Sequence, residues 1–238
     1  MTEIKLPRRD FLKAAGAAGV AGVAATTGIA ACSPETQTAA NASAAAPDTY
    51  LVLTNEEVAF LSAAVDTIIP ADALSPSGTD CGCVVFIDGQ LGGAYGGGAK
   101  MYRAGPHMKG TPEQGYQLPL TPHQFFVAGI RAANAWSEKT YGKLYDRLTP
   151  AERAEALTAW EKGVAQFDGF ESRLFFQRLL QITMEGFFAD PIYGGNRNKA
   201  SWRMLGYPGL PATYADKVEE YRDKPIVVTE PLSIADFS

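Results

Sequence analysis

Apolar side chains recur at helical spacing in four stretches of the chain, and three of these stretches begin with a capping sequence. Thr54 precedes Glu57 and Thr149 precedes Glu152, so each pair can bind the free backbone amides of a first helical turn. Thr121 stands before a proline, which suits the first position of a helix. We expect helices that begin near residues 54, 121 and 149 and a fourth over 171–188. The residues expected to face inward are, in the order of these helices, Val58, Leu61, Val65 and Ile68; Phe125, Phe126, Ile130, Ala133 and Trp136; Ala156, Leu157 and Trp160; and Leu174, Phe175, Leu179, Ile182 and Phe187.

Shorter runs complete this pattern. Residues 84–91 are largely apolar, which predicts a short buried helix but also fits a buried strand. Residues 198–205 and 214–221 can each form a further short helix. Because no series of alternating apolar and polar residues runs through the chain, we expect a mainly α fold, a small helical domain over residues 50–238 with long irregular loops rich in glycine and proline.

The longest loop is expected over residues 92–120. Glycine and proline are too frequent there for regular structure, and loops of this length are either functional or surface excursions. Tyr95, Tyr102 and Tyr116 could supply contact surface for a small ligand. The glycine run over 92–98 lacks both the preceding strand and the following Lys-Ser or Lys-Thr of a nucleotide-binding loop. Nucleotide binding is therefore not expected.

The first 31 residues are similar to a twin-arginine export signal. Arg8 and Arg9 precede Phe11 and Leu12, and a weakly apolar run of alanine, glycine and valine follows. A membrane-spanning helix is the alternative, because this run has about the minimum length for one, but its many glycines and alanines make a poor span. We predict a signal peptide over 1–31, read by the twin-arginine translocase.

A lipobox-like sequence ends this leader. In residues 29–32 cleavage would leave Cys32 as a lipidated first residue, although ordinary cleavage within the same alanine-rich stretch fits equally well. The following residues, up to 49, are mostly alanine, serine, threonine and proline. They hold too few large apolar side chains to fold, which predicts a flexible tether over 32–49.

Composition narrows the function classes. The formal net charge of −5 and the pI near 5.1 argue against a nucleic-acid partner, because such binding needs clustered lysines and arginines. Three cysteines are too few for a disulfide-rich scaffold or for a four-thiolate cluster. The fold must therefore be stabilised by its apolar core.

Side chains suited to catalysis are sparse. His107 and His123 are the only imidazoles, and neither stands at the spacing of a metal motif. Cys81 and Cys83 are separated by one glycine, so a bond between them would be strained. A local disulfide, two buried free thiols and pairing across an interface all remain open. No catalytic, cofactor-binding or metal-binding residue is predicted in this chain.

The most distinctive segment follows the fourth long helix. That helix must end before Pro191, two glycines permit a tight turn, and Asp190 and Asn196 can cap exposed backbone groups. Such a segment can be a rigid corner of the fold or an aromatic surface for another protein. Its candidate residues are Phe187, Phe188, Asp190, Pro191, Tyr193, Gly194, Gly195, Asn196 and Trp202.

This segment, with the twin-arginine leader, resembles the gluconate 2-dehydrogenase subunit 3 family, the small or gamma subunit of membrane-associated FAD-dependent sugar dehydrogenases. The resemblance extends from about Thr54 to Pro211, and residues 187–197 are its most specific part. It implies a noncatalytic, chaperone-like subunit. Its partner would be a large FAD-dependent dehydrogenase of the glucose-methanol-choline type, and a multihaem cytochrome c would form a third subunit.

The resemblance also implies where the cofactors lie. FAD would be bound in the large subunit and haem c in the third subunit, with none in this chain. The small subunit would carry the export signal that its flavin-loaded partner lacks. The complex would then lie in the periplasm, associated with the cytoplasmic membrane through the complex itself or through a lipid on Cys32.

Two other functions compete with this interpretation. An independent exported lipoprotein could bind a small ligand, such as a carbohydrate, at residues 92–120. A stand-alone enzyme could use Asp190, Glu185 and a histidine, although the low histidine count disfavours it. The sequence leaves the sugar, sugar acid or polyol that the complex oxidises undetermined.

Overall fold

The computed structural model describes residues 48–238 except 109, 112, 113, 115, 170, 212, 214, 226–229 and 238. Residues 46–238 form one compact unit. The predicted signal residues Arg8, Arg9, Phe11 and Leu12, the candidate lipidation residue Cys32 and nearly all of the tether lie outside the described residues.

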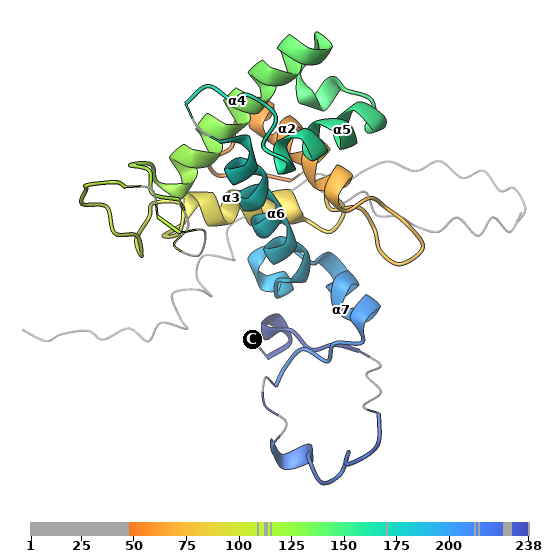
Figure 1. The fold of residues 1–238 in the computed structure, drawn as a ribbon. Coiled ribbons are helices and arrows are strands. Elements are labelled where there is room, and N and C mark those ends of the chain that lie inside the picture. Colours follow the sequence, from red (N-terminus) through yellow and green to blue (C-terminus); the bar gives the residue numbers. More distant parts are fainter. Residues whose placement is uncertain are drawn as a thin grey trace, which may run out of the picture. The chain divides into compact units, whose positions relative to one another are not determined.

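Helices dominate the described part of the chain, which confirms the predicted mainly α fold (Figure 1). The α-helices are α2 (Asn55–Ile68), α3 (Cys83–Gly92), α4 (Pro122–Tyr141), α5 (Pro150–Glu161), α6 (Ser172–Phe188) and α7 (Ala200–Leu205). Short 3-10 helices are η2 (Tyr145–Arg147), η3 (Pro191–Tyr193), η4 (Arg197–Lys199), η5 (Ala215–Lys217) and η6 (Ile234–Phe237). The described residues hold no β-strand, and Gly209 and Leu232 form an isolated parallel bridge.

The predicted helix starts are confirmed at all three capping sequences. In α2, the backbone N–H of Thr54 donates to Glu57 Oε2 at 2.8 Å, and Glu57 N–H donates back to the threonine hydroxyl at 3.3 Å. The same reciprocal pair opens α4 at Thr121 and α5 at Thr149. These bonds satisfy amide groups that a helix leaves free at its N-terminus.

Aromatic rings fill the centre of the core. Phe60 of α2 lies 5.0 Å from the ring of Tyr145, 6.0 Å from that of Trp160 in α5 and 6.1 Å from that of Phe175 in α6. All four side chains are fully buried. Helix α6 packs against α3 and α5, and Figure 1 shows it in teal crossing the yellow α3. Aromatic contacts of this kind stabilise a core beyond the area that they bury.

Helix α3 settles one open alternative, because residues 83–92 form a helix and not a strand. Its buried Asp88 accepts hydrogen bonds from the backbone amides of Leu51, Val52 and Leu53, the last two at 3.0 Å. A buried carboxylate needs such donors to offset its lost hydration. Asp88 therefore anchors the segment that leads into α2.

Irregular segments occupy the predicted loop and the C-terminal region. The described residues of 93–120 form turns and bends, and His123 N–H donates to Gly96 O at 3.2 Å where the loop meets α4. The predicted short helix near 198–205 is present as η4 and α7. The one expected over 214–221 is only η5 followed by turns. Val218 there is 59% exposed, so it contributes little apolar burial that could stabilise a longer helix.

Candidate functional site

The corner after α6 is built by Asp190 and the turn that follows it. Asp190 caps η3, where its Oδ1 accepts a hydrogen bond from Ile192 N–H at 3.0 Å. Gly194 adopts a φ of +90°, a backbone conformation that favours glycine. A Cβ atom on Gly195 would lie 2.2 Å from the carbonyl oxygen of Gly186 in α6. The two glycines therefore let the chain turn and return against α6.

This corner also packs against the start of α3. A Cβ atom on Gly82 would lie 2.3 Å from the carbonyl oxygen of Gly194. Arg197 N–H donates to the carbonyl oxygen of Cys81 at 3.0 Å. The segment thus joins two helices that are distant in sequence.

Asn196 and Trp202 hold the corner from inside. The fully buried Asn196 donates from Nδ2 to Ala189 O at 2.9 Å. Its Oδ1 accepts from the backbone N–H of Ser201 at 3.0 Å and from that residue's hydroxyl at 2.8 Å. Trp202 Nε1 donates to Phe188 O at 3.0 Å, which satisfies a carbonyl at the end of α6.

Of the nine candidate residues of this segment, four are buried, namely Phe187, Gly195, Asn196 and Trp202, and four more are half-buried. The ring of Phe187 is buried and meets that of Phe188 at 4.9 Å in an edge-on arrangement. Tyr193, by contrast, is 57% exposed, and its neighbour Ile192 is 49% exposed. These two side chains are available to another molecule.

The C-terminal segment is held against the corner by Asp190 and Lys199. Asp190 Oδ2 accepts from Ile234 N–H at 2.9 Å, and Figure 1 shows η6, at the label C, beside the segment after α6. Lys199 Nζ donates to Pro231 O at 2.7 Å and to Asp236 Oδ2 at 2.8 Å. The bond to Lys199 lowers the pKa of Asp236, and the same bond raises the pKa of Lys199. We call these contacts of Asp190 and Lys199 with residues 231–236 the clasp. Sequence reasoning missed the clasp, because the residues that it joins are more than 30 positions apart.

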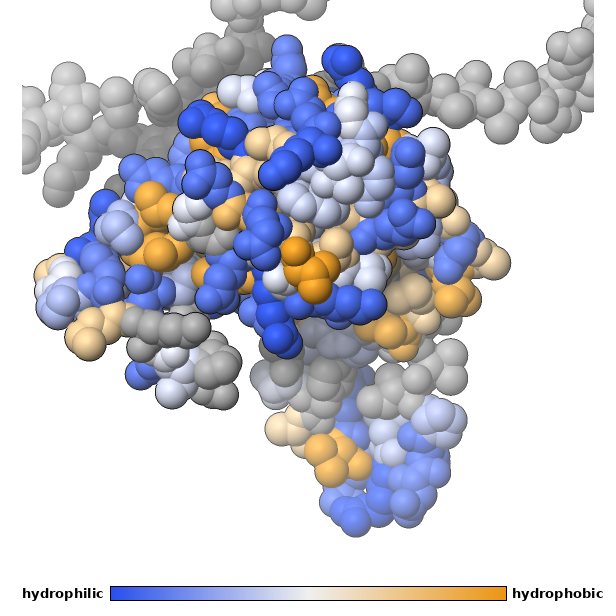
Figure 2. Space-filling model, turned by 45° about the horizontal axis from the view of Figure 1, so that its top comes forward, coloured by the Kyte–Doolittle hydropathy of each residue, from blue (hydrophilic) through white to orange (hydrophobic). Residues whose placement is uncertain are grey.

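Exposed apolar side chains occur at several positions on the short helices of this region and on the turns beside them. We call this set the corner surface: Ile192, Tyr193, Met204, Leu205, Tyr207, Leu232, Ile234 and Phe237. On the face drawn in Figure 2, by comparison, small orange apolar groups are separated by blue hydrophilic residues. Clustered exposed apolar residues are typical of protein interaction sites.

The two cysteines among the described residues adjoin the corner, where Arg197 N–H donates to Cys81 O. Cys81 and Cys83 are free thiols and are buried. Burial raises the pKa of Cys83 to about 12, and it also raises that of Cys81. Both groups therefore stay protonated at neutral pH, which makes them poor nucleophiles and poor metal ligands.

The residues of the stand-alone enzyme hypothesis form structural hydrogen bonds or lie exposed on the surface. Both carboxylate oxygens of Asp190 accept backbone amides, Glu185 is exposed on α6, and His107 is exposed in the loop. No three His, Cys, Asp or Glu side chains gather into a candidate metal site within the described ranges. None of the helices in the part of the chain that the structure describes has the length and apolar character to cross a bilayer.

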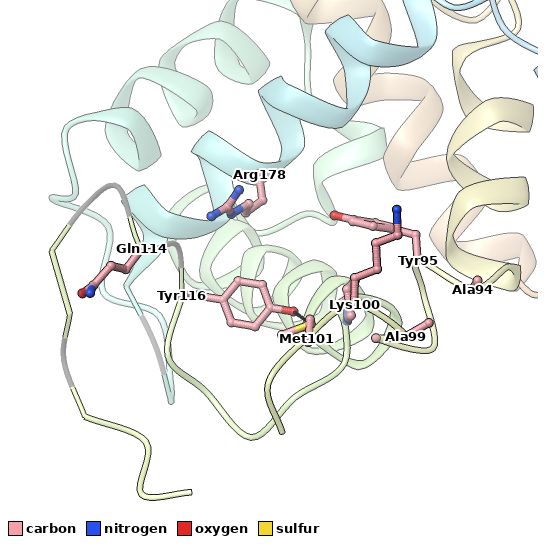
Figure 3. Close-up of a pocket in the computed structure, with 10 residues that line it drawn as sticks. Ala94, Tyr95, Ala99, Lys100, Met101, Gln114, Tyr116 and Arg178 are labelled. Carbon is pink, nitrogen blue, oxygen red and sulfur yellow. Dashed lines mark hydrogen bonds between the residues drawn. The ribbon is translucent and has the colours of Figure 1, made fainter. Parts of the chain in front are cut away.

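A pocket of about 540 Å3 lies where the loop after α3 meets α4 and α6. Tyr95 and Tyr116 line it, as the sequence suggests for a ligand site, whereas Tyr102 is not among its lining residues. Figure 3 shows Arg178 projecting from α6 toward the ring of Tyr116, and Lys100 beside Tyr95. No sequence pattern indicates Arg178 as a lining residue, since it belongs to a helix that is distant from the loop in sequence.

Comparison with known proteins identifies the family. No curated protein and no solved structure matches this chain. A family model described as gluconate 2-dehydrogenase subunit 3 matches residues 55–209, from the start of α2 to the isolated bridge at Gly209. That match spans the whole helical core and the corner after α6, so this chain belongs to the gluconate 2-dehydrogenase subunit 3 family.

Proposed function

We propose that this chain is a noncatalytic small subunit that binds a large FAD-dependent dehydrogenase and escorts it through twin-arginine export. Family membership, which makes the chain a subunit of a gluconate dehydrogenase-type complex, is the observation that carries the proposal. The paired Arg8 and Arg9 in its leader support the export step. An escort needs a partner-binding surface and a signal, and it needs no catalytic group of its own.

The complex would act on the periplasmic side of the cytoplasmic membrane. Its large subunit, of the glucose-methanol-choline type, would bind FAD and oxidise a sugar, a sugar acid or a polyol. A multihaem cytochrome c would pass the electrons onward. A lipid on Cys32 or the complex itself would hold this chain at the membrane.

We assign flavoprotein binding to the corner surface. Tyr193 and Ile192 project from η3, which Asp190 and the two glycines hold in a defined turn. Aromatic and aliphatic side chains on a rigid support lose little conformational freedom on binding, which favours a stable interface. The internal bonds of the signature segment would then serve to present this surface.

Copurification tests this assignment. The chain carrying Tyr193→Asp should retain at most about a tenth of the flavoprotein that the unaltered chain retains, because a charge in an apolar interface costs about 2 kcal/mol or more. Leu74→Asp is the matched control, since Leu74 is 72% exposed and is not one of the corner-surface residues. The measurement is the flavin absorbance of the purified complex.

Two results would count against the proposal. Equal retention of flavoprotein by the Tyr193→Asp and Leu74→Asp chains would remove the corner surface from the interface. A chain that never copurifies with a flavoprotein but binds carbohydrate alone would instead favour the independent lipoprotein.

A further inference from the structure

The pocket beside α4 is held open by contacts that do not involve a ligand. The ring of Tyr116 stacks on the buried Phe125 with centroids 4.6 Å apart, and its hydroxyl donates to Leu120 O at 3.3 Å. A Cβ atom on Gly96 would lie 1.8 Å from Leu91 O, so the loop is packed tightly on the end of α3. The walls are therefore formed in advance, which reduces the entropy cost of binding.

Arg178 gives this pocket a positive charge with unused hydrogen-bonding capacity. Its Cζ lies 5.8 Å from the ring centroid of Tyr116, and its Nη1 donates to Gln181 Oε1 at 2.7 Å. Its Nε is buried and has no hydrogen-bond partner among the described residues. Because that nitrogen is buried while Arg178 as a whole is only half-buried, a ligand in the pocket would reach the guanidinium through its Nη atoms.

Within the described part of the chain no carboxylate forms an ion pair with Arg178, although Glu185 acts on the pocket, since burial and then the Glu185 charge raise the pKa of Tyr95. Glu185, on the same helix, accepts a hydrogen bond from Gln181 Nε2 at 2.8 Å and is not among the lining residues. Lys100 adds a second cation from the loop, and Figure 3 shows its amino group on the same side of the pocket as the ring of Tyr95. Burial raises the pKa of Tyr95 and that of Tyr116, so both phenols are neutral hydrogen-bond donors at neutral pH.

Most of the remaining lining is apolar, and Gln114 adds one side-chain amide. The apolar part consists of the Tyr95 and Tyr116 rings with Ala94, Ala99, Met101 and Pro122 among the other residues. A volume of about 540 Å3 is within the range of small-molecule sites. Apolar walls with a few cationic groups favour a ligand that carries its charge at one end.

We propose that this pocket binds a small organic acid, whose carboxylate pairs with Arg178, whose apolar body lies between Tyr95 and Tyr116, and whose charge is further stabilised by the positive charge of Lys100. A guanidinium presents its donors in a planar fork that matches a carboxylate. A polyhydroxylated body fits less well, because its hydroxyls would lose water without finding enough partners. This inference does not depend on the escort function.

The test compares benzoate with benzamide, which has the same shape and no charge. Isothermal titration of the full chain should detect benzoate, and benzamide should bind about tenfold or more weakly, because it loses the charge-assisted hydrogen bonds. Arg178→Gln and Lys100→Gln should each weaken benzoate binding, the former by about tenfold. Arg173→Gln is the matched control, since Arg173 is an exposed arginine of α6 outside the pocket.

Several results would overturn the proposal. Benzamide binding equal to that of benzoate would remove the role of the carboxylate, and gluconate binding as tight as benzoate would remove the apolar body. The exposed Lys100→Gln chain is not at risk of misfolding, so unchanged affinity in both lysine and arginine variants would refute the site. Loss of benzoate binding when the flavoprotein is bound would assign the pocket to the subunit interface instead.

Discussion

Asn196 illustrates how single side chains shape the corner after α6. Its backbone φ of +44° lies in the left-handed region, which asparagine tolerates better than most residues. Its amide bonds to Ala189 O on one side and to Ser201 on the other, across a turn that closes on α6. One residue therefore supplies both the backbone conformation and the bonds that the turn requires.

Replacement of Asn196 should show how much its hydrogen bonds contribute to the free energy of unfolding. We expect Asn196→Ala to lower the free energy of unfolding by about 3 kcal/mol, because it leaves buried donors and an acceptor without partners. Asn198→Ala is the control, since Asn198 also has a positive φ but is exposed. Urea denaturation of both chains measures the difference. Equal losses would mean that backbone strain, and not the buried amide, determines the effect.

The clasp at Lys199 should depend on pH at both ends of the range. The lowered pKa of Asp236 means that its contribution is present above the ordinary value of 3.8 and is lost as the pH falls through the folded value. The raised pKa of Lys199 means that its contribution is complete below 10.5 and is lost at higher pH. We expect the backbone amide NMR signal of Ser233, which donates to Asp236 Oδ2 at 2.7 Å, to shift in acid and in alkali. The acid shift should disappear in Asp236→Asn, and its persistence there would contradict the assignment.

Among the elements, helix boundaries follow from local sequence, whereas the contacts between helices do not. Thr54, Thr121 and Thr149 could be read as helix starts because a capping residue and its partner are only three residues apart. Asp88 could not be assigned a role, because the amides that it binds begin 35 residues away in sequence. The contacts of Lys199 and the approach of Arg178 to the pocket also join residues that are far apart in sequence, so neither could be predicted.

Helix packing also predicts that alanine has opposite effects on stability at two glycine positions. A Cβ atom on Gly89 in α3 would have no neighbour within 4 Å, so Gly89→Ala should stabilise the chain by about 0.5–1 kcal/mol. A Cβ atom on Gly129 in α4 would lie 2.2 Å from a ring carbon of Phe175, so Gly129→Ala should destabilise it by about 1–3 kcal/mol. Thermal unfolding measures both. Stabilisation by both substitutions would contradict the packing of α4 on α6.

For the molecule as a whole, the segment over residues 187–197 was recognisable in the sequence. Which of its residues are buried supports and which are exposed could not be predicted. Candidate residues such as Asn196 and Trp202 proved to be buried supports, whereas the exposed apolar set includes Phe237 from beyond the family match. The corner surface depends on the tertiary contacts of Asp190 and Lys199, which no local pattern encodes.

The location of the flavoprotein tests the escort proposal most directly. The large subunit would be expressed with the unaltered chain, with a chain in which Arg8 and Arg9 are both lysine, and without the chain. Flavoprotein and flavin would then be quantified in periplasmic and cytoplasmic fractions. We expect periplasmic flavoprotein only with the unaltered chain and cytoplasmic retention in the other two cases. Full export and activity of the flavoprotein in the absence of this chain would contradict the account.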